Sequence, residues 1–556
     1  MNTIKSTIIA FLGLFILHAC KTTYPVNQGV TVENIAGAEQ LYGIKFTPSE
    51  RDSMQDYLKR NLKGYEERRQ YTLNNNVGMA LYFDPRPQGF HFTQNGTDHQ
   101  WVADTTVKLP ISKEELAFLP IPQLAGLIKT GQITSEDLTA FYIERIKTYD
   151  PFLSSVITLT EERALREARR ADKEIASGNY KGVLHGIPFG IKDLLSTEGY
   201  NTTWGASPFK DQLIDEDAEV VKRLNAQGAV LIAKLSSGAL ASGDVWYGGK
   251  TKNPWNLEQG ASGSSAGPGS ATSAGLVPFS IGSETWGSII SPSSTCGITG
   301  LRPTFGRVSR YGAMTLSWSM DKLGPIARNS LDCAIVLDAI YGYDDKDRAT
   351  VPYAFKYRLD VQKLRVGYFK ELFDEEYDDK ENDLAVLDLL KKEGFELIPL
   401  EMPDSIPFGS MATIIRAESG ALFDELVYKN LDDLMVRQTR FARPTTLRQS
   451  QLIPAVEYIQ ANRYRAVLIE KLNKTFEEVD VIISPTSGGN QSLMTNLTGH
   501  PAISIPNGFD EEGSPTSITF IGGLYKDNAI LQLGTWYQEQ TDFEEKHPVV
   551  EDWETR

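Results

Sequence analysis

Short apolar runs bounded by turns alternate with helical stretches from Pro110 onward. The runs are typical of buried strands: Gly190-Ile191-Lys192, Val230-Leu231-Ile232-Ala233 and Val277-Pro278-Phe279-Ser280-Ile281. The charged, Ala-rich stretch Glu161–Ala176 precedes these runs and is typical of a solvent-facing helix. This alternation predicts an α/β fold in which a central mixed β-sheet is surrounded by helices.

A tract of small residues, Gly260–Ser273, interrupts this pattern. Runs of Gly, Ser, Ala and Thr are common in flexible linkers. Strand-like segments flank this tract on both sides, however, so it does not lie at a domain boundary. A Gly/Ser loop inside a core usually lets the backbone approach a ligand closely. The tract therefore predicts part of a binding or catalytic site.

The composition excludes several classes of function. Asp and Glu number 72 against 56 Lys and Arg, for a formal charge of −16. Binding of nucleic acid through counterion release needs the opposite balance, so no nucleic-acid partner is expected. The six histidines include no pair at metal-ligand spacing, and three cysteines are too few for a disulfide framework or a four-cysteine zinc site. We therefore expect no metal site.

The first twenty residues have the pattern of an export signal. Lys5 places a positive charge before the apolar run Ile8–Leu17, as in the n-region of a signal peptide. The run itself is too short to span a bilayer. The run ends in Leu17-His18-Ala19-Cys20, which resembles the lipobox of bacterial lipoproteins, where the cysteine becomes the acylated N-terminus. An ordinary secretory peptide with an incidental cysteine is the alternative. We expect an exported protein that is anchored by lipid at Cys20 to a bacterial membrane, on its periplasmic or cell-surface side.

These patterns predict a division of the chain into segments with different compositions. The main domain follows a charged helical extension, and its range 370–470 reads as a helical cap over the sheet. The predicted boundaries are a signal peptide at 1–19, a tether at 20–40, an N-terminal helical extension at 41–108, a catalytic domain at 109–546 and a C-terminal tail at 547–556.

Three separated segments contain the residue types of a serine-nucleophile site, namely serines, a lysine and glycines. They are Leu184–Asp193, Ala261–Gly267 and Gly282–Ile289. They closely resemble motifs of the amidase signature family, namely a lysine in GIP-x-GIKD, a GGSSGG tract and a serine 24 positions after the first serine of that tract. Ser288 follows Ser264 by 24 positions. The resemblance runs from about residue 112 to 545. Further segments that resemble family motifs are Thr295–Ser309, Asp321–Arg328 and Asn496–Pro506.

The resemblance implies a catalytic triad of Ser288 as nucleophile, Ser264 as bridging serine and Lys192 as base. A serine hydroxyl needs a base within hydrogen-bond reach, and a lysine can serve if burial keeps it neutral. Ser264 can relay the proton because a hydroxyl both donates and accepts. His185 is the histidine nearest to these motifs in the sequence. The resemblance also implies a cis peptide bond between Gly263 and Ser264, and a reaction that needs no metal or cofactor.

By the same resemblance, the backbone N–H groups of Thr285, Trp286 and Gly287 form the oxyanion hole together with that of Ser288. Many relatives have Gly, and peptide-amidase-like ones Asp, at the position of Trp286. The backbone donor is unaffected by that change of side chain. The indole then either shapes the substrate pocket, to which Gly263 is also assigned, or packs in the core behind the loop.

Four other residues stand out. Glu284 replaces a common family Asp, and we expect it to have a structural hydrogen-bonding role. Glu418 belongs to an Ala-Glu pair that recurs in the family, and no catalytic role is assigned to it. Cys296 and Cys333 could pair, although two buried thiols are favoured because Cys296 falls inside a family motif.

The resemblance implies hydrolysis of a carboxamide through an acyl-enzyme, with release of a carboxylic acid and ammonia or an amine. The substrate is expected to be a small-molecule or peptide amide. Two alternatives stay open at this point. One is the glutamine-amidohydrolase subunit of a tRNA-dependent amidotransferase, and the other is a catalytically silent lipoprotein that binds amides or peptides.

Overall fold

The computed structural model describes residues 29–70, 73–92, 99–357, 360–403, 405–550 and 553. The chain separates into two compact units, residues 1–73 and residues 74–556. The predicted signal peptide and Cys20 lie outside the described residues. Within the described ranges, no helix is both long and apolar enough to cross a membrane.

The first unit contains two helices, α1 (Val32–Tyr42) and α2 (Pro48–Arg68). α2 agrees with the helical extension predicted for this part of the chain. α1 lies partly inside the predicted tether, residues 20–40, and is a correction to it. The Thr31 side chain accepts a hydrogen bond from the backbone N–H of Asn34, and this N-cap starts a helix where composition alone indicated a coil.

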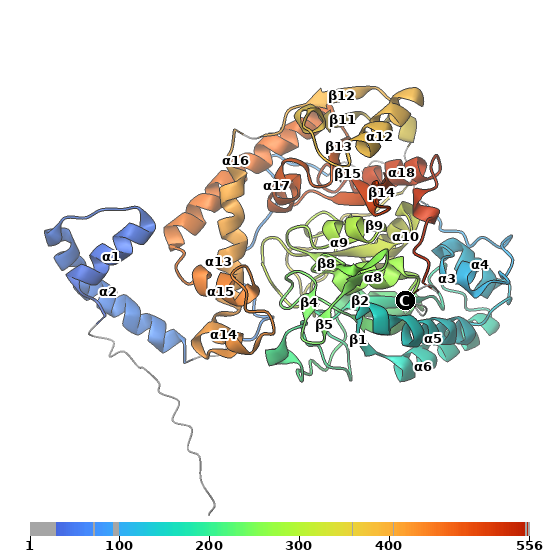
Figure 1. Ribbon diagram of the computed structural model, residues 1–556, viewed down its shortest axis with the longest axis horizontal. Coiled ribbons are helices and arrows are strands. Elements are labelled where there is room, and N and C mark those ends of the chain that lie inside the picture. Colours follow the sequence, from blue (N-terminus) through green and yellow to red (C-terminus); the bar gives the residue numbers. More distant parts are fainter. Residues whose placement is uncertain are drawn as a thin grey trace, which may run out of the picture. The chain divides into compact units, whose positions relative to one another are not determined.

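The described part of the second unit is built on one mixed sheet of eleven strands (Figure 1). β2 runs parallel to β3 and to β8, whereas the strands from β8 through β13 in the spatial order are antiparallel neighbours. The predicted apolar runs form β2, β3 and β8, which lie side by side and are buried. The spatial order is β1 (Val156–Leu159), β3 (Val230–Leu235), β2 (Pro188–Lys192), β8 (Phe279–Glu284), β10 (Lys322–Ala327), β9 (Thr299–Arg302), β14 (Ala502–Phe509), β15 (Pro515–Gly522), β13 (Val481–Pro485), β11 (Val366–Phe369) and β12 (Leu397–Leu400).

Helices surround this sheet, as predicted. α5 and α6 pack near the β1–β3 end, and α12 and α18 pack on β14 and β15. The second unit also has two short hairpins, β4 (Val245–Trp246) with β5 (Gly249–Lys250) and β6 (Lys252–Asn253) with β7 (Asn256–Gly260). Its α-helices are α3 (Lys113–Ala117), α4 (Ile121–Lys129), α5 (Ser135–Leu153), α6 (Glu161–Ala176), α7 (Glu219–Ala226), α8 (Ala266–Ser273), α9 (Ile290–Thr295), α10 (Ser330–Ile340), α11 (Lys370–Asp374), α12 (Lys380–Lys392), α13 (Thr413–Leu422), α14 (Asp424–Tyr428), α15 (Arg443–Ser450), α16 (Ala455–Glu478), α17 (Gln491–Thr498) and α18 (Asp527–Gln538).

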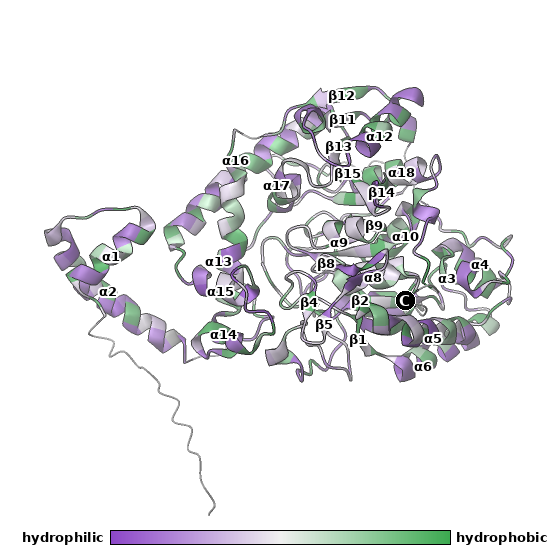
Figure 2. Ribbon diagram, viewed as in Figure 1, coloured by the Kyte–Doolittle hydropathy of each residue, from purple (hydrophilic) through white to green (hydrophobic). Residues whose placement is uncertain are grey.

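Helix α6 shows why such charged stretches fold against the sheet. Ala164, Ala168 and Ala171 recur at helical spacing and are buried, while most of its charged side chains remain at least partly exposed (Figure 2). A helix with one apolar stripe buries that stripe and leaves its polar face in water. The predicted bounds of this helix, Glu161–Ala176, are confirmed.

The predicted domain boundaries need three further corrections. Residues 74–108, assigned to the extension, belong to the same compact unit as the catalytic domain. The range 370–470 is mainly helical but also contains β12, an edge strand of the central sheet. The tail 547–556 is not free, because the apolar residues Val550 and Trp553 are buried in the main core.

Candidate active site

The topology brings the three predicted motifs to one edge of the sheet. Lys192 is the last residue of β2, and Glu284 is the last residue of its parallel neighbour β8. Parallel neighbours end at the same edge, so the loop after β8, which carries Ser288, begins near Lys192. Ser264 and Ser265 immediately precede α8, which packs against β2, β3 and β8.

Lys192 is fully buried, and its amine is surrounded by serine hydroxyl groups. Its Nζ lies 2.7 Å from Ser264 Oγ, 3.0 Å from Ser283 Oγ and 3.1 Å from Ser265 Oγ. The backbone carbonyl oxygen of Ser283 lies 3.4 Å away. The structure thus brings Lys192 and Ser264 together, and Ser265 and Ser283 are additional partners that the sequence motifs contain but that were not predicted.

The surroundings of Lys192 favour its neutral form. Burial lowers the pKa of Lys192 well below its usual value, and the charges of Asp321 and Glu284 only partly oppose this effect. Hydroxyl groups can hydrogen-bond a neutral amine without demanding its positive charge. A neutral buried lysine can accept a proton, which is the property required of a general base.

The Gly263–Ser264 peptide bond is cis, as the resemblance implies. A Cβ atom on Gly263 would lie 2.0 Å from the carbonyl oxygen of Gly243, so the absence of a side chain permits close packing of two backbones. This gives Gly263 a packing role, and its assignment to the substrate pocket stays a prediction. The N–H of Ser265 donates to the carbonyl oxygen of Ser288 at 3.1 Å and ties the Gly/Ser tract to residues 285–289, which we call the nucleophile loop after the predicted role of Ser288.

Ser288 is partly exposed and lies in the turn that precedes α9. Among the described residues, its hydroxyl makes no hydrogen bond, so the contact from Ser264 to Ser288 is not formed. Catalytic hydrogen bonds of free enzymes are often long and tighten when substrate binds. Within the same part of the chain, the backbone N–H groups of residues 285–288 also make no hydrogen bond, which leaves them available to an oxyanion.

Trp286 does not pack in the core. Its side chain is 39% exposed, and it lines a cavity of about 420 Å³ together with Gly287, Ile290 and Tyr377. Of the two interpretations of this residue, core packing is therefore wrong. The indole is placed where a ligand near the nucleophile loop can touch it.

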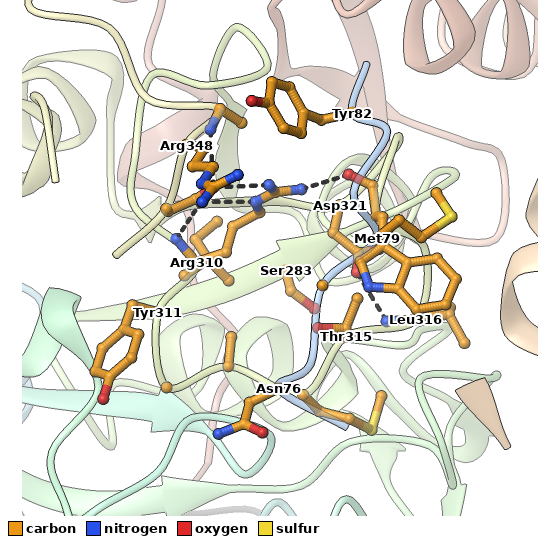
Figure 3. A pocket seen from close by; sticks show the side chains of 18 of the residues that line it. Asn76, Met79, Tyr82, Ser283, Arg310, Tyr311, Thr315, Leu316, Asp321 and Arg348 are labelled. Carbon is orange, nitrogen blue, oxygen red and sulfur yellow. Dashed lines mark hydrogen bonds and ion pairs between the residues drawn. The ribbon is translucent and has the colours of Figure 1, made fainter. Parts of the chain in front are cut away.

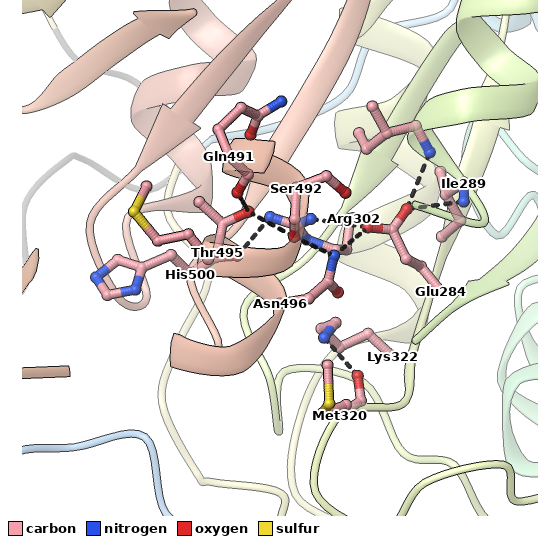
Figure 4. A network of polar contacts seen from close by, with 12 residues as sticks. Glu284, Ile289, Arg302, Met320, Lys322, Gln491, Ser492, Thr495, Asn496 and His500 are labelled. Carbon is pink, nitrogen blue, oxygen red and sulfur yellow. Dashed lines mark hydrogen bonds and ion pairs between the residues drawn. The ribbon is translucent and has the colours of Figure 1, made fainter. Parts of the chain in front are cut away.

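Glu284 holds the backbone directly after Ser288, the predicted nucleophile (Figure 4). Its Oε2 accepts hydrogen bonds from the N–H groups of Ile289, at 2.8 Å, and Ile290, at 3.0 Å. Its Oε1 accepts from Arg302 and from Asn496, both at 2.7 Å. These residues come from three different sequence motifs, so Glu284 joins them in one network. Its predicted structural role is confirmed.

The charge of Glu284 is part of this network. Burial alone raises the pKa of Glu284, but the Arg302 guanidinium and the hydrogen bonds outweigh it and lower the pKa to about 2. Because this folded-state pKa is below the ordinary value of 4.5, the stabilisation by Glu284 is complete above about pH 4.5 and is lost as the pH falls toward 2.

We expect Glu284→Ala to lower the free energy of unfolding by about 3–5 kcal/mol, because it leaves the buried Arg302 unpaired. Activity should fall as well, since the loop of Ser288 loses two anchors. Urea unfolding at pH 7 measures the first effect. Glu376→Ala is the matched control: its carboxylate is 92% exposed and pairs with Lys380, so its loss should cost about 1 kcal/mol at most. Equal effects of the two substitutions would contradict this account.

Asp321 supports the other end of the nucleophile loop. Its Oδ1 accepts a hydrogen bond from Thr285 Oγ1 at 2.6 Å, and its Oδ2 accepts from the N–H groups of Leu316 and Ser317 at 2.8 and 2.9 Å. Burial raises the pKa of Asp321, and these hydrogen bonds oppose that rise. Asp321 lies in a predicted motif, but its contact with Thr285 left no signal in the sequence.

A cavity of about 460 Å³ reaches this group of residues, and we call it the active-site cavity (Figure 3). Ser283 and Thr285 line it, so it extends to the hydroxyl groups around Lys192. Residue 76 and residues 78–82, from the predicted extension, form part of its wall. Figure 3 shows Asn76, Met79 and Tyr82 of that segment around the same pocket as Ser283 and Thr315.

The segment 76–82 is fixed at its start by Asn75. The Asn75 side chain donates to the carbonyl oxygen of Thr315 at 2.9 Å and accepts from the N–H of Thr315 at 2.6 Å. The side-chain amide of Asn75 thus exchanges two hydrogen bonds with the backbone of Thr315, as the peptide groups of two paired strands do. No sequence pattern indicates it, because the two residues are 240 positions apart.

His185 and the two described cysteines take no part in the site. His185 Nε2 lies 3.0 Å from a carboxylate oxygen of Glu174, and its Nδ1 accepts from the N–H of Lys181 at 3.1 Å. Cys296 and Cys333 are free and buried, which confirms the prediction of two buried thiols. Burial raises the pKa of both thiols, so they are unreactive at neutral pH.

Comparisons with known proteins agree with this geometry. The family model described as Amidase matches residues 137–492. A glutamyl-tRNA(Gln) amidotransferase subunit of Methylococcus capsulatus is 34% identical over 477 residues, which cover 77% of this chain and 98% of that protein. The peptide amidase of Stenotrophomonas maltophilia is 26% identical, with a TM-score of 0.67 over 76% of this chain and 96% of that one. An amidase family protein of Bacillus anthracis is 25% identical, with a TM-score of 0.70 over 79% of this chain and 93% of that one.

Proposed function

Because this chain belongs to the amidase family and hydrolyses amide C–N bonds, we propose that it does so through an acyl-enzyme on Ser288, with Lys192 as base and Ser264 as relay. One observation carries the proposal: a fully buried lysine amine lies 2.7 Å from a serine hydroxyl at the edge where the nucleophile loop begins. A charged surface lysine could not act in this way.

The hydrogen bonds leave the amine ready to accept a proton. The Ser265 hydroxyl donates to the carbonyl oxygen of Ser283 at 3.0 Å, so its oxygen accepts from Lys192. A neutral amine has two N–H donors, and Ser283 provides the acceptor for the second one. The lone pair of Lys192 then faces Ser264.

The reaction follows from this arrangement. Ser288 Oγ attacks the amide carbon while its proton passes to Ser264, whose own proton passes to Lys192. The N–H groups of residues 285–288 bind the oxyanion, and each such donor contributes about 2.7–4 kcal/mol to the transition state in comparable acyl-transfer sites. The C–N bond then breaks, and the proton returns through Ser264 to the departing nitrogen. Water repeats the attack on the acyl-enzyme and releases the carboxylic acid and free Ser288.

Glutamine amidohydrolysis is the second candidate for the specific activity. The 34% identity to a glutamyl-tRNA(Gln) amidotransferase subunit favours it, whereas the structural likeness to a peptide amidase favours an amidated peptide. The two can be separated by ammonia release from free glutamine, an amidated dipeptide, an aryl amide and an aliphatic amide. Release from glutamine alone would select the amidotransferase-like activity. Release mainly from the other amides would select a hydrolase of exogenous amides.

The proposal includes export and lipid anchoring at Cys20. It rests on the sequence Leu17-His18-Ala19-Cys20 after an apolar run and on the acidic composition, which gives no support for a nucleic-acid partner. The membrane partner is then reached through the lipid on Cys20.

We expect the full-length chain, expressed in a bacterium, to incorporate labelled palmitate and to sediment with membranes. Cys20→Ala should abolish the label, because the sulfur is the site of acylation. Cys296→Ala is the matched control and should keep the label, since Cys296 is buried. A soluble, unlabelled wild-type protein would identify the apolar run as an ordinary secretory peptide.

A further inference from the structure

Two cavities of the second unit share one wall. A second cavity of about 390 Å³, the cap cavity, lies among residues of α13, α15 and α16. Met79 and Trp318 line both this cavity and the active-site cavity. The other lining residues described for the two cavities differ. The two cavities therefore meet at Met79 and Trp318.

The cap cavity suits an apolar guest. Ala417, Gly420, Ala421, Ile453 and Ala455 provide much of its surface. Small apolar residues leave room for an alkyl or aryl group and offer it no competing hydrogen bonds.

Several of its polar lining residues already have partners within the protein, whereas the buried indole N–H of Trp318 has no partner among the described residues. Glu418 accepts a hydrogen bond from Tyr458 at 2.8 Å, Ser450 donates to the carbonyl oxygen of Thr446 at 2.7 Å, and Gln451 donates to that of Gly420 at 3.3 Å. A polar ligand would have to displace these bonds, whereas an apolar group would not.

Trp318 is held rigidly at this boundary. The hydroxyls of its two neighbours, Ser317 and Ser319, donate to Glu418 at 2.5 and 2.8 Å, and the N–H of Ser319 donates to it at 3.1 Å. Arg465 donates to Ser319 Oγ at 2.8 Å and to its carbonyl oxygen at 2.7 Å. The loop is thus clamped on both sides of the indole.

Met79 forms the adaptable half of the wall. It belongs to the segment 76–82, which Asn75 fixes at its start. A methionine side chain has several rotatable bonds and fits irregular gaps, unlike an indole. The boundary between the two cavities therefore combines the fixed indole of Trp318 with the flexible side chain of Met79.

We propose that Trp318 and Met79 are specificity-determining residues that limit the length of the apolar group an amide substrate can carry. The proposal rests on the proposed function, because it takes the cavity next to Lys192 as the substrate site. Trp318 and Met79 close the active-site cavity toward the cap cavity, so an apolar chain that runs from the reacting amide toward them ends at this wall. Removal of the indole joins this cavity to the cap cavity and admits longer chains.

The test compares hydrolysis of butanamide and octanamide by the chain lacking residues 1–20. We expect Trp318→Ala to raise the octanamide-to-butanamide ratio of kcat/KM at least tenfold, and Met79→Ala to raise it by a smaller factor. Leu213→Ala is the matched control, because Leu213 is largely exposed and is not among the residues that line either cavity. Unchanged ratios in both variants, or an equal rise in the control, overturn the proposal.

A binding measurement separates failure of this proposal from failure of the proposed mechanism. Calorimetry of octanamide with Ser288→Ala, and with Ser288→Ala combined with Met79→Ala or Trp318→Ala, needs no turnover. Tighter binding in the double variants supports the partition even if Ser288 proves not to be the nucleophile. Met79 lies in an irregular segment, so its variant keeps the test valid if Trp318→Ala fails to fold. Equal binding by all variants overturns the partition.

Discussion

Replacement of Ser288 by alanine is expected to reduce amide hydrolysis by a factor of about 10⁴–10⁶, the range seen when the nucleophile of a serine hydrolase is removed. The acyl-enzyme cannot form without the hydroxyl oxygen. The oxyanion hole remains and accounts for the residual rate. Ammonia release measured at saturating amide checks the loss in kcat.

The same substitution should leave stability nearly unchanged. The Ser288 hydroxyl makes no hydrogen bond in the described part of the structure and is partly exposed, so its removal breaks no contact. We expect a free energy of unfolding within about 0.5 kcal/mol of the wild type. Ser177→Ala, at the exposed end of α6, is the matched control and should retain full activity. Substantial turnover by a folded Ser288→Ala enzyme would show that another group attacks the amide.

Much of the site could be predicted because its parts are local in sequence. Lys192 ends an apolar run that is recognisable as a buried strand, and Ser264 lies in a Gly/Ser tract that strands flank. Ser288 follows a third apolar run at the family spacing. Strands recognised by their apolar pattern are buried here on both faces, so the central sheet was predictable by the same means.

The cavity walls could not be predicted in this way. Asn75 and Thr315 meet across 240 positions, and the partners Ser317 and Glu418 are 101 positions apart. Such contacts depend on the tertiary arrangement and leave no periodic pattern. β12 was missed for a different reason. It is a short edge strand that contains Pro399 and lies within a charged, helical stretch, where the helical pattern dominates.

Lys192→Met is expected to reduce kcat/KM at neutral pH by a factor of about 10²–10⁴, the usual contribution of a general base. Methionine keeps a similar volume in a fully buried site but cannot accept the proton. Burial lowers the pKa of Lys192, so the wild-type rate should rise with pH through that pKa and level off above it. The variant should lack this step and recover part of its rate at high pH, where hydroxide takes the proton.

Lys192→Arg separates a base from a mere hydrogen-bond donor. A guanidinium retains N–H donors for Ser264 and Ser283 but stays protonated at every accessible pH. If Lys192 only positions the hydroxyls, the arginine variant should keep substantial activity. If it is the base, this variant should be as slow as Lys192→Met. A wild-type pH–rate profile in either variant would remove Lys192 from the mechanism.

The same lysine also links activity to stability. Its folded-state pKa lies below the ordinary 10.5, so between these two values the unfolded chain binds one more proton than the folded chain. The free energy of unfolding therefore falls as the pH drops through this window. It falls because the unfolded chain gains a proton on this amine, whereas the folded chain keeps the amine neutral. Lys192→Met removes this penalty, so we expect its melting temperature at pH 7 to equal or exceed that of the wild type and its dependence on pH to be shallower. An inactive variant that is no less stable would place Lys192 in the chemistry rather than in the support of the fold. A large loss of stability would instead mean that its contacts with the three serine hydroxyls hold the site together.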